Sequence, residues 1–234
     1  MQSSDNTTSK KLMIIGITLI LSFLITSTFI NSLLSTWVFQ IQKPTITTLI
    51  SSRILHWIGL LLVWFYAIRI EKQKLLLWEN HNYKLLHFIS HIIVVWIVII
   101  VFMIPIKIAL SFAGLSQVSE KLKALKSIIS QCKLLIPVVA ITAGVVEEYI
   151  FRGYIQPRLE VIFKNSWVAI LLTSLLFSAL HSGYGTFQNL IGPFVIGVLF
   201  SIYYWKYRNI YVLIILHTLI DLIALSAILR SSTF

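Results

Sequence analysis

The amino-acid sequence predicts an all-α, polytopic membrane protein: a bundle of about seven transmembrane helices with one amphipathic helix at the membrane interface. Hydrophobic residues make up 58% of the 234-residue chain, above the roughly 45–50% that is usual in soluble domains. The mean hydropathy is +0.90. Apolar runs near the roughly 20 residues that cross a bilayer use up almost the whole length. We therefore expect a single membrane domain with six to eight spans.

The expected transmembrane helices follow from the apolar runs in chain order, separated by short polar connections such as residues 71–84. They cover residues 12–38, 46–69, 85–112, 134–155, 166–182, 189–206 and 211–229. The first run is too long for the apolar part of a signal peptide and lacks a small-residue cleavage site, so we interpret it as a retained helix. The small size and short loops favour a prokaryotic inner (cytoplasmic) membrane as the location.

Between the third and fourth spans, residues 114–133 predict an amphipathic helix that lies in the membrane interface. Apolar residues recur there at helical spacing against lysines: Leu115, Val118, Leu122, Leu125, Ile128 and Ile129 against Lys121, Lys123 and Lys126. We divide the chain into an N-terminal part, residues 1–133, with this helix at its end, and a helical core, residues 134–234, that carries the candidate catalytic motifs.

The formal net charge of +11 does not indicate a nucleic-acid-binding protein. The basic residues lie mainly in short connections, where cytoplasmic retention and anionic lipid headgroups explain them, and they form no single basic patch. The expected partners are the lipid bilayer and a peptide or membrane-protein substrate, and no nucleic acid. One cysteine, Cys132, excludes an intramolecular disulfide and a cysteine-based zinc cluster.

The adjacent carboxylates Glu147 and Glu148 interrupt the apolar segment 134–155. A carboxylate at bilayer depth costs several kcal/mol unless it is paired, hydrated or protonated, which makes such residues functional-site candidates. Glu148 and Arg152 are four residues apart and can form an ion pair on one helix face. Glu147 points about 100° around the helix, so its partners have to come from other helices.

Further ionisable residues follow in the last helices. His181 ends the fifth apolar run before a glycine-containing loop, and His217 and Asp221 share one face of the last helix. Each has a purely structural interpretation by itself, as an interfacial histidine or a buried hydrogen-bonded pair. Their concentration in so few helices favours one shared site. The four remaining histidines lie near helix ends or connections, and we interpret them as interfacial: His56, His81, His87 and His91.

Three segments resemble, in order and spacing, the motifs of the CAAX-protease and bacteriocin-processing (CPBP, or Abi) family of intramembrane proteases. The motifs are Glu-Glu-x-x-x-Arg, Phe-x-x-x-His and His-x-x-x-Asn/Asp, matched by Glu147, Glu148 and Arg152, by Phe177 and His181, and by His217 and Asp221. The resemblance covers roughly residues 134–229. It implies an endopeptidase in which a glutamate activates water inside a cavity open to the membrane.

By this resemblance Glu147 is the general base, helped by His181, and Glu148 holds Arg152 or tunes the base. His217 and Asp221 then face the developing oxyanion. The prenyl-protein processing members carry Asn where this chain has Asp221. An ionised Asp cannot donate a hydrogen bond, so Asp221 has to be protonated, orient His217 or bind a metal.

We favour a mechanism without a cofactor, because no two-histidine motif of the zincin type is present. If a divalent metal such as zinc is bound, its candidate ligands are Glu147, His181, His217 and Asp221. Other intramembrane chemistries fit less well. The His-Glu-x-x-His motif is absent, Asp221 has no second membrane aspartate beside it, and Ser182 follows His181 directly in sequence without thereby being close to it in space.

Two rival classes of function remain open from the sequence. The first is a non-catalytic membrane scaffold or bacteriocin self-immunity protein with the same fold. The second is a proton-coupled small-solute transporter that uses the Glu-His-Asp cluster as a relay, with Gly192-Pro193 as a break in a helix. The sequence does not specify a substrate, and prenylated CAAX proteins are not assumed to be one.

Overall fold

The computed structural model describes residues 2–33, 45–117 and 119–231, and every regular element within these ranges is helical. Six helices in the described part are long and apolar enough to cross a membrane, by length and composition. They are α1 (Gln2–Leu33), α2 (Ile46–Tyr66) with its extension to Glu71, α3 (Leu85–Phe112), α7 (Ser166–Leu180) with the short 3₁₀ helix η4 (Ser182–Tyr184) that follows it, α8 (Gln188–Tyr207) and α9 (Ile210–Arg230). The all-α, polytopic membrane class is confirmed.

The remaining predicted span, residues 134–155, is a helical run with a change of hydrogen-bonding pattern. Helix α5 (Leu135–Glu148) passes directly into the π-helix η3 (Tyr149–Ile155), and α6 (Gln156–Phe163) follows. A π-helix (η2, Ala67–Glu71) likewise extends α2. Hydropathy does not distinguish i→i+5 from i→i+4 hydrogen bonding, so the sequence predicted plain α-helix at both places. Such π segments are frequent at functional sites.

Two predicted boundaries were wrong. Helix α1 begins at Gln2 rather than at residue 12, because the helix continues through polar residues and Lys10 Nζ donates to the carbonyl of Ile162 at 3.2 Å. Residues 34–38 of the predicted span lie outside the described residues. The amphipathic helix α4 (Glu120–Gln131) begins after Ser119, whose Oγ donates to the Tyr184 carbonyl at 2.6 Å.

Helix α4 has the predicted two-sided character. Its residues Ile128 and Ile129 are buried against α5 and α9, whereas Lys121 and Lys123 are exposed. Leu115 precedes the helix, and Val118 lies outside the described residues.

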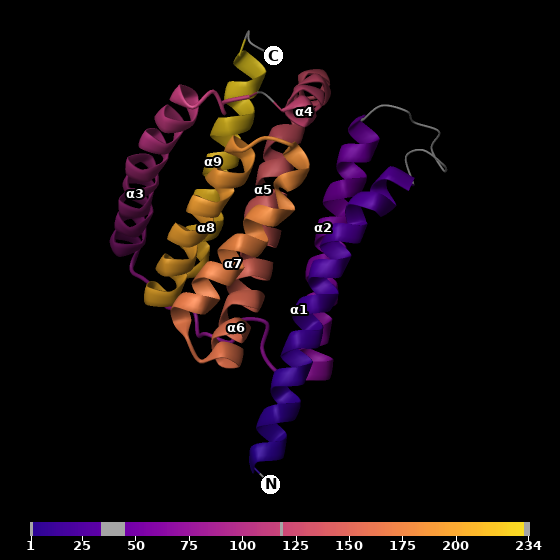
Figure 1. The fold of residues 1–234 in the computed structure, drawn as a ribbon, viewed down its shortest axis with the longest axis vertical. Coiled ribbons are helices and arrows are strands. Elements are labelled where there is room, and N and C mark those ends of the chain that lie inside the picture. The colour runs from indigo at the N-terminus through magenta and orange to yellow at the C-terminus, as the bar shows by residue number, and fades with distance from the viewer. Residues whose placement is uncertain (1, 34–44, 118, 232–234) are drawn as a thin grey trace.

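The helices form a layered bundle that places the predicted motif segments in its middle (Figure 1). The pair α1 and α2 stands on one side, α3 stands on the other, and α4 lies at the end of the bundle where α5 begins. Helix α5 packs against α9, α7 packs against α8, and α2 also contacts α5. The motif helices α5, α7 and α9 are therefore covered from both sides.

The close packing of α5 against α9 depends on Gly144. A Cβ atom at this position would meet Thr218 Oγ1, and it would lie only 3.0 Å from both the Ile214 carbonyl oxygen and the Thr218 backbone nitrogen. Because the backbone of α9 cannot rotate away as a side chain can, a larger residue has to push the two helices apart. Small residues commonly permit such close approach between membrane helices.

We expect Gly144→Val to lower peptide hydrolysis at least tenfold. Glu147 and Glu148 lie one turn further along α5, so a shift of α5 relative to α9 displaces them. Misplacement of reacting groups by about 1 Å costs on the order of a hundredfold. The matched control is Gly192→Ala in α8, where the added Cβ meets only Met103 Cε at 3.5 Å. Equal activity of the two variants would contradict the role assigned to this contact.

A buried polar network joins the end of α2 to α6, which the sequence did not predict. Glu71, expected in a polar connection, is buried, and Arg158 is fully buried beside it. Glu71 Oε2 accepts from Arg158 Nε at 2.8 Å and from Nη2 at 2.5 Å, and Glu71 Oε1 accepts from the Tyr154 hydroxyl at 2.5 Å.

The remaining donors of Arg158 are used as well. They bond to the backbone carbonyls of Lys74, Leu75 and Tyr154 at 3.1–3.2 Å, and the guanidinium lies 3.7 Å from the centre of the Tyr154 ring. A buried ion pair of this kind is tolerated only when both partners have their hydrogen bonds satisfied. The network therefore connects the N-terminal helices to the motif-bearing core.

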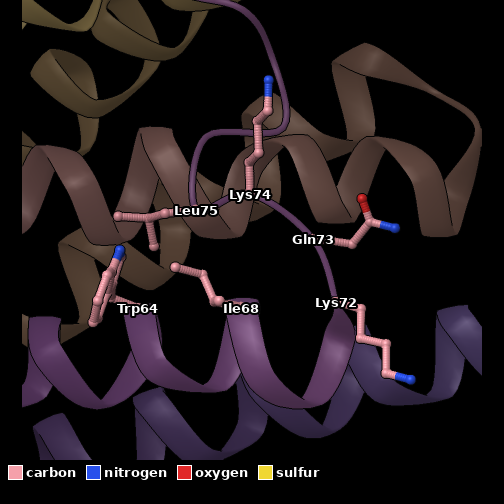
Figure 2. Close-up of a pocket in the computed structure, with 6 residues that line it drawn as sticks. All are labelled: Trp64, Ile68, Lys72, Gln73, Lys74 and Leu75. Carbon is pink, nitrogen blue, oxygen red and sulfur yellow. The ribbon is translucent and has the colours of Figure 1, made fainter.

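A shallow, open hollow of about 490 Å³ lies next to this junction. Figure 2 shows the apolar side chains of Trp64, Ile68 and Leu75 near one another, with Lys72, Gln73 and Lys74 along the chain that follows α2. Its lining contains neither a carboxylate nor a histidine, so it offers none of the groups that the sequence motifs bring together elsewhere.

Candidate active site

The ion pair predicted on α5 is present and enclosed. Arg152 Nη1 donates to Glu148 Oε1 at 2.9 Å, and both side chains are fully buried. The guanidinium also donates to the Gly197 carbonyl at 3.3 Å, and it lies 4.5 Å and 5.4 Å from the ring centres of Phe177 and Phe200. The charge of Arg152 is thus surrounded by one carboxylate and two aromatic faces, an arrangement that favours a cation.

His217, from α9, bonds to the same carboxylate oxygen. Its Nδ1 lies 2.7 Å from Glu148 Oε1, so this oxygen receives both Arg152 and His217. A carboxylate can only accept, which places the proton on Nδ1. The Nε2 atom therefore faces the opposite way and donates only when the ring is an imidazolium.

The free side of His217 faces two carboxylates. Its Nε2 lies 3.9 Å from Glu147 Oε2 and 3.9 Å from Asp221 Oδ2. Both distances are too long for a direct hydrogen bond but short enough for a strong charge interaction, and catalytic contacts are often long before substrate binds. Asp221 therefore does not orient His217 through a hydrogen bond. Glu148 does so instead.

His181 approaches from the end of α7. Its Nδ1 lies 2.9 Å from the Phe177 carbonyl oxygen, which places a proton on Nδ1 and leaves Nε2 as the outward nitrogen of the neutral ring. The ring packs on Phe177 at a centroid distance of 4.8 Å and on Tyr184 at 6.2 Å. His181 also interacts electrostatically with Glu147 and with Asp221.

Phe177 contacts both the buried Arg152 and the half-buried His181. Its buried ring contacts Arg152 and lies 6.0 Å from the His217 ring centre, while its carbonyl group holds His181. The structure thus brings together all seven residues that the three sequence motifs contributed: Glu147, Glu148, Arg152, Phe177, His181, His217 and Asp221.

The candidate metal ligands do not form a metal site in the part of the chain that the structure describes. No three side chains among its histidines, cysteines, aspartates and glutamates are arranged to hold one ion. His217 bonds through Nδ1 to Glu148, and His181 bonds through Nδ1 to a carbonyl group, so both rings keep Nε2 free. Because no three of these side chains surround one point among the described residues, we derive no step through a metal.

Four residues near the cluster were missed in the sequence. Arg53 and His56 come from α2, Lys121 comes from α4, and Tyr184 follows α7. Glu147 interacts electrostatically with Arg53 and His56, and Tyr184 interacts with Glu147 and Asp221. His56, which we interpreted from the sequence as interfacial, is within electrostatic range of Glu147 in the structure. The sequence could have indicated Arg53, because it is a charged residue within an otherwise apolar span.

Residues 130–223 match the family described as Type II CAAX prenyl endopeptidase Rce1-like. This range contains all three motifs, from Glu147 to Asp221, and it leaves out α1 to α4 except for the last two residues of α4. No curated protein and no solved structure matches the chain significantly. The Rce1-like family is a protease family, and the match confirms, over residues 130–223, the resemblance to the CAAX-protease and bacteriocin-processing family.

Proposed function

We propose that this protein is an intramembrane endopeptidase that hydrolyses a peptide bond of a membrane-associated peptide or protein. The observation that carries the proposal is the orientation of His217. A buried Glu148-Arg152 pair holds its Nδ1, and its Nε2 faces Glu147 and Asp221. Two roles are thereby separated: one carboxylate supports the histidine, and the other is free to act on water.

In the proposed reaction Glu147 accepts a proton from a water molecule, and the resulting hydroxide attacks the carbonyl carbon of the scissile bond. The carbon–nitrogen bond then breaks, and the proton passes from Glu147 to the leaving amine. The products are a carboxylic acid and an amine, which balances the water consumed. General-base catalysis of this kind contributes about 10²–10⁴-fold to a rate.

The oxyanion that forms during attack needs hydrogen-bond donors. In its imidazolium form His217 supplies Nε2–H, and the negative charges of Glu147 and Glu148 next to the ring favour that form. Asp221, 3.9 Å from the same nitrogen, supplies a second donor in its protonated form. His181, which interacts electrostatically with Glu147, assists the proton transfer. We propose that no metal is required, so millimolar 1,10-phenanthroline should leave the rate unchanged.

The proposal is tested with purified protein in detergent micelles and an internally quenched peptide. Because the matched family is described as a CAAX prenyl endopeptidase, the first probe carries a farnesylated cysteine followed by two aliphatic residues and one variable residue. An unprenylated peptide of the same sequence runs beside it. Mass spectrometry in ¹⁸O-labelled water should show one ¹⁸O atom in the new carboxyl group.

The proposal would be contradicted if the purified protein cleaved neither peptide and no protein in a pool of membrane-protein substrates. The transporter alternative then predicts solute flux in proteoliposomes that scales with a proton gradient. The scaffold alternative predicts that substitutions of Glu147, His181 and His217 leave the cellular phenotype intact. The short connections between the helices favour a prokaryotic inner membrane as the location of this protein.

Asp221 should contribute a hydrogen-bond donor to the oxyanion, and two substitutions separate this role from a role of charge. Asp221→Asn keeps a donor in its side-chain amide, whereas Asp221→Leu has none. One oxyanion donor is worth about 10²–10³-fold, so kcat of Asp221→Asn should exceed that of Asp221→Leu at least tenfold. Equal kcat values in the two variants would show that Asp221 donates nothing to the transition state.

A further inference from the structure

Arg53 is a charged residue within α2 that has no carboxylate partner in contact. Its Nη2 donates to Ser52 Oγ at 3.1 Å, and its Nε is buried without a hydrogen-bond partner among the described residues. No ion pair of Arg53 occurs within the described ranges, in contrast to Arg152 and Arg158. A guanidinium at this depth is costly unless something anionic compensates it.

The guanidinium faces the candidate active site. Arg53 interacts electrostatically with Glu147 on α5, with Asp221 on α9 and with Tyr184 after α7. The packing of α2 on α5 is held one turn further along by Trp57, whose Nε1 donates to Thr142 Oγ1 at 3.3 Å. Arg53 is therefore on the side of α2 that covers the three motif helices rather than on its lipid-facing side.

A second cation approaches the same place from α4. Lys121 Nζ lies 4.7 Å from the centre of the Tyr184 ring, and the hydroxyl of Ser119 ties the start of α4 to the Tyr184 carbonyl. Although Lys121 is exposed as a whole residue, partial desolvation of its ammonium group, and then the positive charge of Arg53, lower its pKa. The positive charges of Arg53 and Lys121 thus act on one another, and two interacting like charges favour an anion that binds between them. In the described part of the chain Lys121, like Arg53, makes no ion pair with a carboxylate.

We propose that Arg53, together with Lys121, forms a binding subsite for a carboxylate group of the peptide substrate beside the catalytic glutamate. A guanidinium presents paired N–H donors that match the two oxygens of a carboxylate. The ammonium group of a lysine adds a second positive charge. Both residues lie outside the region that matches the protease family. The inference rests on the proposed function, because the carboxylate belongs to the molecule that is cleaved.

The competing explanation is that Arg53 only balances the charges of Glu147 and Asp221. The two explanations differ in their dependence on the substrate. A charge-balancing Arg53 affects hydrolysis of every peptide equally, whereas a carboxylate-binding Arg53 affects only peptides that carry the carboxylate. The experiment therefore follows the logic of a double-mutant cycle: kcat/KM is measured for each enzyme variant with each peptide variant.

Three farnesylated, internally quenched peptides serve as probes: one with a free C-terminal carboxylate, one with a C-terminal amide, and one with a C-terminal amide and an Asp after the scissile bond. For wild-type protein, kcat/KM should be at least tenfold higher for a carboxylate-bearing peptide than for the neutral amide. The comparison of the first and third peptides identifies whether the carboxylate is terminal or belongs to a side chain.

Arg53→Gln should remove this preference, so that kcat/KM for the carboxylate-bearing peptide and for the neutral amide agree within about twofold in the variant. Arg53→Lys should retain part of the preference, and Lys121→Gln should reduce it less than Arg53→Gln. Arg69→Gln, an exposed arginine at the end of the same helix, is the matched control and should change nothing. An equal loss for all three peptides in Arg53→Gln, or no preference in the wild type, would overturn the subsite.

Binding to the Glu147→Gln protein separates this inference from the proposed function. Fluorescence anisotropy of the same peptides, with the donor dye alone, should show tighter binding of the carboxylate form and loss of that difference in Glu147→Gln/Arg53→Gln. If the wild type cleaves nothing while this difference persists, the proposed function fails and the subsite stands. If cleavage occurs without any such difference, the subsite fails and the proposed function stands.

Discussion

Replacing Glu147 by Gln is expected to lower peptide hydrolysis by at least about a hundredfold while the protein remains folded. Gln has nearly the same shape, but it cannot accept a proton from water, so the general-base contribution of about 10²–10⁴-fold is lost. Glu147 is partly open, and its Oε2 lies 3.9 Å from His217 Nε2, so the substitution breaks no direct hydrogen bond. The measurement is kcat with the quenched peptide, beside the thermal unfolding midpoint in detergent.

The matched control for this variant is Glu120→Gln, on the exposed face of α4 and paired with Lys123 at 2.7 Å. It removes the same charge from an exposed side chain that is not part of the Glu147 cluster, and it should retain full activity. Wild-type kcat in the Glu147→Gln protein would contradict the assignment of the base. Glu148→Gln should instead lower both activity and the unfolding midpoint, because it removes the charge that holds Arg152 and His217.

Replacing Glu71 by Ala is expected to produce the largest loss of stability, about 3–5 kcal/mol in the free energy of unfolding. The cost arises because the substitution leaves Arg158 buried without its counter-charge. The same change removes the acceptor of the Tyr154 hydroxyl, which is buried as well. Reversible unfolding in mixed detergent micelles, followed by circular dichroism, measures the difference.

Two further variants test the cause of this loss. Glu71→Leu combined with Arg158→Leu removes both charges and should be more stable than Glu71→Ala, because no uncompensated ion remains. Glu120→Ala breaks the exposed pair with Lys123 and should leave the unfolding midpoint within error of wild type. A Glu71→Ala protein as stable as Glu120→Ala would show that the network does not hold the N-terminal helices on the core.

Much of the fold could be predicted because apolar runs report directly on membrane spans. Helix α3 was predicted at residues 85–112 and is found at Leu85–Phe112, and α8 and α9 agree within one residue at each end. The start of α1 and the π-helical segments could not be predicted in this way. Polar residues can continue a helix outside the bilayer, and hydropathy carries no information about hydrogen-bond register.

The candidate site could be predicted in part, because its local pairs depend on spacing within one helix. Four residues separate Glu148 from Arg152, so their ion pair follows from helix geometry. The contact of Glu148 with His217 joins residues 69 positions apart and depends on how α5 packs against α9. The sequence left open whether Glu148 only holds Arg152, and whether Asp221 orients His217.

The sequence by itself thus determined the membrane class, the helical order and the residues that three short motifs contribute. Only the tertiary structure decided which carboxylate holds His217, that Arg53 and His56 of α2 face the site, and that Glu71 pairs with Arg158. The physical reason is the range of the interactions. Periodicity and hydropathy describe one helix at a time, whereas partners of buried charges are chosen by the packing of helices distant in the chain.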